Sequence, residues 1–107
     1  MKNIAIFASG EGSNFEVIAE ACKQGVLQAK VVFMVCDKPN AKVVQRAADR
    51  DIESFVFSPK DYSSKSDYER EIVRMLDERN VDLVCLAGYM RIVSDVLLSS
   101  YEGKMIN

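Results

Sequence analysis

The chain has 107 residues, 49% of them hydrophobic, and its 14 basic and 16 acidic side chains give a formal net charge of −2. This length and apolar content suffice for one domain with a buried core, so we expect a single domain over residues 1–107 and exclude a disordered chain. Because the charges are spread along the sequence without a block of one sign, the composition argues against nucleic acid or an anionic membrane as a partner.

The first elements are a strand, a loop containing glycine, and a helix. The apolar run at residues 3–8 predicts the strand. Ser13 and Glu16 have the spacing of a capping box, which predicts Ser13 as the N-cap, and Gly25 follows as a C-terminal stop. The helix is expected over residues 14–24, because four apolar residues recur there at helical spacing: Phe15, Ile18, Ala19 and Cys22.

The loop Ser9–Asn14 predicts an anion site, because its glycines permit a tight turn and the following helix offers free N–H groups and a positive dipole end. It is neither a dinucleotide fingerprint, since Phe15 replaces the third glycine, nor a Walker loop, since no Gly-Lys-Ser/Thr follows. What remains is a small anion held by the main chain of Gly12, Ser13 and Asn14. The alternative is a plain strand-to-helix turn that Ser13 only caps.

The rest of the chain alternates helical spacing of apolar residues with the short apolar runs of strands. A helix is expected after Asn40 as its N-cap, and another over residues 66–79, where Ser66 and Glu69 have capping-box spacing and the stem of Arg79 covers apolar surface. Strands separated by helices pair in parallel through right-handed crossovers, so the predicted fold class is α/β with a doubly wound, mostly parallel sheet. Apolar runs predict its further strands at residues 30–36, 53–57, 82–87 and 104–107.

The cysteines Cys22, Cys36 and Cys85 are widely spaced, and each lies in an apolar stretch. This pattern supports neither a disulfide framework nor a zinc site, and the sequence contains no histidine. The chain opens into a strand pattern without the regions of a signal peptide, and no apolar run reaches membrane-spanning length. We therefore expect a cytoplasmic protein with reduced cysteines and no metal.

Ligands of open parallel sheets bind at the carboxyl ends of the strands. Besides the first loop, the segment Gly88–Val93 and the final residue, Asn107, fall there. Arg91 follows a buried strand and is surrounded by apolar residues, an arrangement that suits the wall of a ligand pocket. An ordinary helix entrance, in which Arg91 pairs with a surface carboxylate, explains the same pattern equally well. Met90 is expected in the core.

Two polar residues have both a functional and an ordinary interpretation. Lys65 is the last residue of a loop at residues 57–65 that we predict to be mobile. Its ammonium group either reaches an acidic ligand or, more simply, is solvated at the entrance of a helix. Asn107 ends an expected interior strand, where its amide donates to a developing oxyanion or is part of a frayed end. Residue types and spacing alone leave these alternatives open.

Three segments together resemble the phosphoribosylglycinamide formyltransferase family: Ser9–Asn14, Leu86–Val93 and Met105–Asn107. The match follows the whole chain in order and spacing, including Asp67–Glu71 in the expected third helix, and covers roughly the N-terminal half of the family's length. It implies a Rossmann-like formyltransferase fold, truncated after the fifth strand. It also implies transfer of a formyl group from 10-formyltetrahydrofolate to the amine of glycinamide ribonucleotide in de novo purine biosynthesis, without a metal, by a monomer or homodimer.

The resemblance also implies roles for single residues. Asn107 is the catalytic asparagine, whose amide contacts the formyl group of the folate and stabilises the oxyanion. Lys65 contacts the folate at a position where the family more commonly has arginine. The ribonucleotide phosphate is held by Gly12, Ser13 and Asn14, and the pterin ring of the folate is held largely through the main chain of Met90, Arg91, Ile92 and Val93.

The histidine and aspartate that complete the family's catalytic set lie beyond residue 107. The resemblance therefore implies that these 107 residues alone do not catalyse the transfer. Formyltetrahydrofolate hydrolase and initiator-tRNA formyltransferase share the fold, but the serine-asparagine phosphate loop argues against both. An alternative of another class is a non-catalytic phosphate- or nucleotide-binding module that uses the first loop alone.

Overall fold

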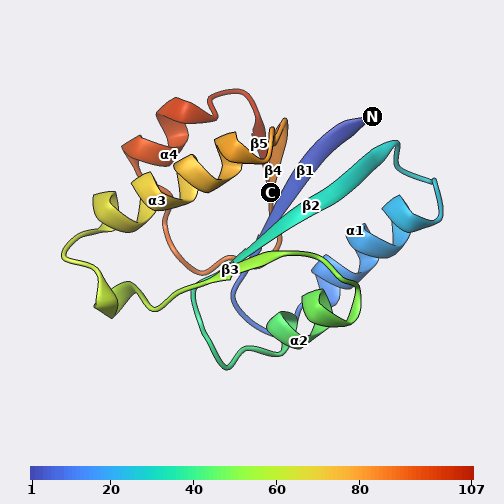
Figure 1. Cartoon of the computed structure of the whole chain (residues 1–107), viewed down its shortest axis with the longest axis horizontal. Helices are drawn as coiled ribbons and strands as arrows, with labels where there is room; N and C mark the ends of the chain where they lie inside the picture. The colour runs from blue at the N-terminus through green and yellow to red at the C-terminus, as the bar shows by residue number, and fades with distance from the viewer.

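Strands and helices alternate along the chain in the computed structural model, which describes residues 1–107 (Figure 1). All five predicted strands are confirmed, each to within one residue of its expected bounds. In chain order the elements are β1 (Lys2–Ala8), α1 (Ser13–Lys23), β2 (Ala29–Cys36), α2 (Lys42–Asp49), β3 (Ser54–Val56), a 3-10 helix (Pro59–Asp61), α3 (Lys65–Glu78), β4 (Leu83–Leu86), α4 (Asp95–Ser100) and β5 (Met105–Ile106).

The five strands form one sheet in the order β3-β2-β1-β4-β5, and every neighbouring pair is parallel. Ala8 of β1 pairs with Cys36 of β2, and Phe7 pairs with Leu86 of β4. The residues that follow these strands therefore leave the same edge of the sheet side by side. The strand order reverses between β1 and β4, which is the position where open α/β sheets bind ligands. The predicted fold class is confirmed.

Helices cover both faces of the sheet, as Figure 1 shows: α1 and α2 lie on one side of the strands, α3 and α4 on the other. The core is accordingly divided in two. On the α1 side, Phe15 packs with Met34 and Val43. On the α3 side, Phe7 and Phe33 of the sheet pack with helix residues that include Ile72, and Arg79 lies over the Phe33 ring with 4.5 Å between its guanidinium carbon and the ring centroid. The sequence expectation for the Arg79 stem is confirmed.

The start of α1 differs from the sequence expectation. Its N-cap is Gly12, with a φ of 86°, and Ser13 is the first helical residue. The capping box predicted from Ser13 and Glu16 does not form, since no side chain caps this helix. Glu16 binds the guanidinium of Arg50 on α2 instead, with its Oε1 atom 3.0 Å from Nε. An ion pair between two helices thus replaces a local bond within one.

The starts of α2 and α3 are also displaced. The N-cap of α2 is Ala41, one residue after the predicted Asn40, and its side chain makes no capping bond. The N-cap of α3 is Ser64 rather than Ser66, and its hydroxyl accepts a hydrogen bond from the N–H of Asp67 at 3.2 Å. The two serines are separated by one residue, so spacing alone did not distinguish them.

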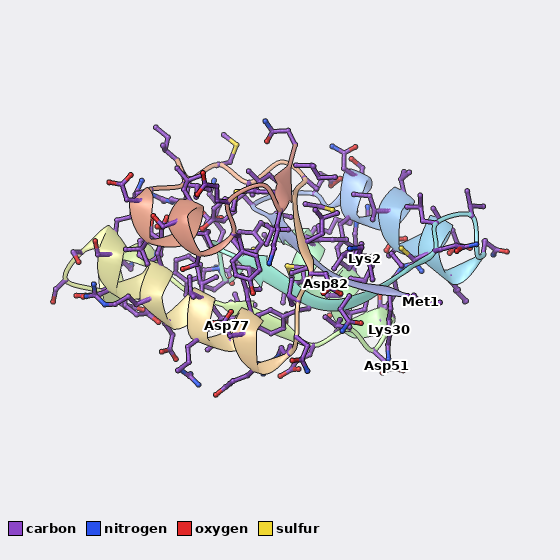
Figure 2. All side chains as sticks on the ribbon, turned by 90° about the horizontal axis from the view of Figure 1, so that it is seen from above. Met1, Lys2, Lys30, Asp51, Asp77 and Asp82 are labelled. Carbon is purple, nitrogen blue, oxygen red and sulfur yellow. The ribbon has the colours of Figure 1, made fainter.

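The amino ends of the strands carry charged side chains. Figure 2 shows Lys2, Lys30, Asp51 and Asp82 near Met1, around the starts of β1 to β4. Apolar or weakly polar residues fill the strands themselves, so the sheet separates this charged edge from the carboxyl edge. No helix of the chain combines the length and the apolar character that crossing a lipid bilayer requires. Two of its free cysteine thiols, Cys36 and Cys85, are buried, and the third, Cys22, is half-buried.

Candidate functional site at the carboxyl edge of the sheet

The loop after β1 offers free main-chain donors. The N–H groups of Gly12, Ser13 and Asn14 donate to no acceptor within the protein, and they stand at the N-terminus of the 11-residue helix α1. The side chains of Ser13 and Asn14 are exposed, and Ser13 does not cap the helix, which contradicts the plain-turn alternative in that respect. Unpaired N–H groups at the positive end of a helix dipole attract an anion. The geometry of the loop therefore suits the predicted anion site.

Contacts from α2 hold this loop in shape. The N–H of Val43 donates to the Gly10 carbonyl at 3.0 Å, and Nε of Arg46 donates to the Glu11 carbonyl at 2.7 Å. Gly12 is buried against the same helix: a Cβ atom built on it would lie 2.7 Å from Cγ2 of Val43. The carbonyls of the loop are thus bound from behind by α2, which leaves its N–H groups facing outward.

The segment after β4 is tied to the same loop through Ser9. The Ser9 hydroxyl accepts the N–H of Met90 at 2.7 Å and donates to Oδ1 of Asp37 at 2.5 Å. The N–H of Ser9 in turn donates to the carbonyl of Gly88 at 3.2 Å. Gly88 has a φ of 80°, a left-handed conformation that glycine adopts without strain. A single buried serine therefore connects the ends of β1, β2 and β4.

Arg91 forms an ion pair with Asp37, with 2.9 Å between Nε and Oδ2. Its partner is not a surface carboxylate, the alternative that the sequence leaves open, because Asp37 is buried with 2% exposure. The hydrogen bond with Asp37 raises the pKa of Arg91, because the neighbouring carboxylate stabilises the guanidinium cation. Only Nε of Arg91 is bonded, so its two terminal nitrogens keep their donors free.

Lys65 and Ile92, two residues predicted to bind the same ligand, are in direct contact. Nζ of Lys65 donates to the main-chain carbonyl of Ile92 at 2.7 Å. Ile92 is 80% exposed and Met90 is 71% exposed, so the expectation that Met90 lies in the core is wrong. The chain turns at Gly88 after β4 has ended, which moves this side chain off the sheet. Val93, in contrast, is half-buried and packs against the α3-side core.

Glu69 fixes the far end of the segment. This residue of α3 is 2% exposed, and its carboxylate accepts bonds from the N–H of Ser94 at 3.0 Å, the Ser94 hydroxyl at 2.7 Å and the N–H of Leu97 at 3.2 Å. The capping box predicted from Ser66 and Glu69 is therefore absent. The carboxylate stabilises the N-terminus of α4, where a negative charge complements the free N–H groups.

Asn107 lines an apolar pocket of about 550 Å³ together with Asn14. The pocket lies between α1 and the last two strands, and its other walls include Ile18, Cys85 and Ile106. One side chain from the predicted phosphate loop and the predicted catalytic amide thus share a cavity, at the reversal of strand order. Nowhere in the chain do three His, Cys, Asp or Glu side chains gather closely enough to hold a metal ion.

The sequence profile of the formyl transferase family matches residues 2–107. The chain belongs to this family. The phosphoribosylglycinamide formyltransferase of Bacillus subtilis (strain 168) is 49% identical over 107 residues, which make up 100% of this chain and 55% of that protein. The chain therefore spans about half the length of this relative and of the phosphoribosylglycinamide formyltransferase of Haemophilus influenzae.

Solved structures agree in fold with this chain. Glycinamide ribonucleotide transformylase 1 from Geobacillus kaustophilus is 54% identical and superposes with a TM-score of 0.97, covering 98% of this chain and 56% of that one. Phosphoribosylglycinamide formyltransferase from Bacillus halodurans is 47% identical with a TM-score of 0.93, covering 97% of this chain and 54% of that one. The resemblance of the sequence to this family is confirmed, and so is the fold that it implied.

Three side chains that shape the candidate site were missed by sequence reasoning. Ser9 was treated only as part of the glycine loop, and Glu69 was assigned to a capping box. Asp37 was not considered, although a lone acidic residue directly after a near-continuous apolar strand marks the carboxyl edge of a parallel sheet. The position of Asp37 was the one available signal of its role. A carboxylate buried at this edge requires polar partners, and those partners would belong to the site.

Proposed function

We propose that the protein transfers a formyl group from 10-formyltetrahydrofolate to the amine of glycinamide ribonucleotide, a step of purine biosynthesis. The observation that carries the proposal is the shared pocket of Asn14 and Asn107 beside the free N–H groups of the first loop. A phosphate bound at this loop would bring the ribonucleotide to the pocket into which the Asn107 amide can donate. The similarity to phosphoribosylglycinamide formyltransferases supports the choice of substrates.

The ribonucleotide phosphate would bind at the N-terminus of α1. Its oxygens accept hydrogen bonds from the main-chain N–H groups of Gly12, Ser13 and Asn14, with the Ser13 hydroxyl and the Asn14 amide as further donors. The rigid backing by α2 keeps these donors in place before the ligand arrives, which lowers the entropic cost of binding.

The folate would bind along Met90, Arg91, Ile92 and Val93, with Lys65 at the same segment. Main-chain groups here suit a flat heterocycle, because its ring donors and acceptors pair with N–H and C=O groups in one plane. The exposed side chains of Met90 and Ile92 offer apolar surface to the ring. The free terminal nitrogens of Arg91 are donors for an acidic group of the ligand.

Asn107 would act on the transition state. The amine attacks the formyl carbon, the C=O electron pair moves to the oxygen, and collapse of the tetrahedral intermediate breaks the bond to N10 of the folate as a proton passes from the amine to N10. The side-chain amide of Asn107 donates to the oxyanion, and removal of such a donor typically costs about 3 kcal/mol. The resemblance assigns the movement of the proton to a histidine and an aspartate beyond residue 107.

The test is the formyl-transfer rate of the protein, with any residues that follow Asn107 in its gene, compared with its Asn107→Ala variant. We expect kcat to fall by about 100-fold while the affinity for glycinamide ribonucleotide stays unchanged. Asn40→Ala, an exposed substitution outside the proposed site, is the matched control and should keep full activity. A sample of intact mass 12.0 kDa should show no transfer. An unchanged kcat for Asn107→Ala contradicts the assigned role.

A second candidate is a phosphate- or nucleotide-binding module without catalysis. The observation in its favour is that the first loop is complete in itself, because all its free donors come from consecutive residues and its supports come from α2. Binding of the ribonucleotide by the protein without any binding of folate, measured by calorimetry, would favour this module over the transferase.

A further inference from the structure

The segment Met90–Ser94 is held by side chains that come from three other parts of the fold. Ser9 after β1 binds the Met90 N–H, Asp37 after β2 binds the Arg91 side chain, and α3 supplies Lys65 and Glu69 for the carbonyl of Ile92 and the main chain of Ser94. None of these bonds is local in sequence: Ser9 and Met90 are 81 residues apart, and even the closest pair, Glu69 and Ser94, is 25 apart. The shape of the segment is therefore set by tertiary contacts.

Asp37 is the support that binds both Ser9 and Arg91. Its side chain has 0% exposure, and both of its carboxylate oxygens are bonded, Oδ1 to the Ser9 hydroxyl at 2.5 Å and Oδ2 to Nε of Arg91 at 2.9 Å. Burying a carboxylate is costly unless it is paired and hydrogen-bonded, so these two bonds are strongly favoured. Asp37 thereby fixes the Arg91 side chain directly and the Met90 N–H through Ser9.

We propose that Asp37 is a positioning residue for the folate-binding segment. It touches neither ligand in the proposed mode of binding and acts by holding Arg91 with its terminal nitrogens outward and the main chain of Met90 in the orientation that receives the ring. This inference rests on the proposed function. Asp37 has no such connection to the phosphate donors of Gly12, Ser13 and Asn14, which are held by α2 instead.

The ion pair controls the position of the charged Arg91 side chain. The Arg91 side chain is 41% exposed and borders a polar cavity of about 860 Å³, whose walls carry charges of both signs: Glu11, Lys38, Lys42 and Lys60. Without Asp37 the arginine would lose its one bonded partner and be free to rotate into solvent. The buried carboxylate holds the guanidinium at the carboxyl edge of the sheet through Nε.

The test uses Asp37→Asn, Arg91→Ala and the double variant of the protein, with 5-formyltetrahydrofolate and glycinamide ribonucleotide as probes in calorimetry. Asparagine keeps an oxygen toward the Ser9 hydroxyl but turns an NH2 group toward Nε of Arg91, so it removes the Arg91 contact selectively. We expect Asp37→Asn to weaken folate binding about tenfold and to leave ribonucleotide affinity within about twofold. In the Arg91→Ala background, Asp37→Asn should add less than about twofold, because the two changes remove the same contact.

A matched control separates positioning from loss of stability. Arg79→Ala breaks the ion pair with Glu53 and the contact with Phe33, both away from the carboxyl edge, and should lower stability without changing either affinity. Equal loss of both ligands in Asp37→Asn, or an undiminished effect in the Arg91→Ala background, overturns the positioning role. Failure of the unsubstituted protein to bind folate overturns the proposed function and this inference with it, whereas folate binding that Asp37→Asn leaves intact overturns only the inference.

Discussion

Lys65 donates a hydrogen bond from Nζ to the main-chain carbonyl of Ile92 at 2.7 Å. Lys65 is the first residue of α3, where a positive charge opposes the helix dipole. The lysine is therefore not placed there to stabilise its own helix. Its contact links α3 to the exposed segment after β4, and it shows that the lysine is more than a solvated side chain at a helix entrance.

Replacement of Lys65 by methionine should weaken folate binding more than it destabilises the fold. Methionine keeps most of the apolar stem but has no donor, and the exposed Ile92 carbonyl can bind water instead. We expect a loss of stability of no more than about 1 kcal/mol and a loss of folate affinity of about fivefold. Calorimetry with 5-formyltetrahydrofolate measures the second effect. Lys30→Met, at an exposed lysine on the amino edge of the sheet, is the control, and an equal loss there would refute the role of Lys65.

Substitution of Gly12 by alanine should damage both the fold and the phosphate site. The new Cβ would lie 2.7 Å from Val43 Cγ2, and the residue has a φ of 86°. Strain and overpacking together should cost about 2–4 kcal/mol in the free energy of unfolding. Gly25→Ala is the matched control, because Gly25 has a φ of 79° with no atom within 4 Å of its Cβ position, so strain alone applies.

The two variants are compared by urea unfolding and by titration with inorganic phosphate. Gly25→Ala should lose only about 1 kcal/mol and keep its phosphate affinity. Equal destabilisation of the two variants would mean that α2 moves away from the loop, contrary to the packing of Val43 against Gly12.

Loss of Glu69 should release the start of α4. Glu69→Ala removes a buried carboxylate and leaves three donors of Ser94 and Leu97 without their acceptor, so we expect about 3 kcal/mol of destabilisation. Glu69→Gln should cost less, since one oxygen remains, although its NH2 group meets a donor. Amide hydrogen exchange would show faster exchange at Leu97 before global unfolding. Unchanged protection there would contradict the cap.

Acid should destabilise the protein through its ion pairs. The hydrogen bond to Arg50 lowers the pKa of Glu16 below its ordinary value of 4.5, and the bond to Arg79 does the same for Glu53. A carboxylate with a depressed pKa in the folded state contributes stability that is fully present above the unfolded pKa and is lost as the pH falls through the folded value. The stabilisation from these pairs is therefore intact at neutral pH and is lost below pH 4.5.

Urea unfolding of the protein and of Glu16→Gln across this range measures the effect. Glu16→Gln should be less stable at neutral pH and should lose less of its remaining stability on acidification. Glu102→Gln, at an exposed glutamate that forms no ion pair, serves as the control. Parallel acid curves for the protein and Glu16→Gln would show that the pair with Arg50 is not formed in solution.

Local patterns sufficed for the strands and for three of the four α-helices, whereas no bounds were predicted for α4 (Asp95–Ser100). Apolar runs located five strands to within one residue, because strands covered on both faces need continuous apolar sequence. The glycine loop before α1 was located by the same means, since tight turns and helix starts depend on nearest neighbours. The alternation of these elements then determined a parallel sheet, and with it the edge at which the candidate site lies.

Only the tertiary structure decided what the polar side chains do. Glu16 and Glu69 had capping-box spacing, yet one binds Arg50 on another helix and the other caps α4. Asp37 and Ser9 acquire their roles because the parallel register sets the ends of β1, β2 and β4 side by side. A carboxylate binds whichever donor the fold brings within about 3 Å, and for a buried carboxylate that donor usually comes from a distant part of the chain, which spacing does not encode.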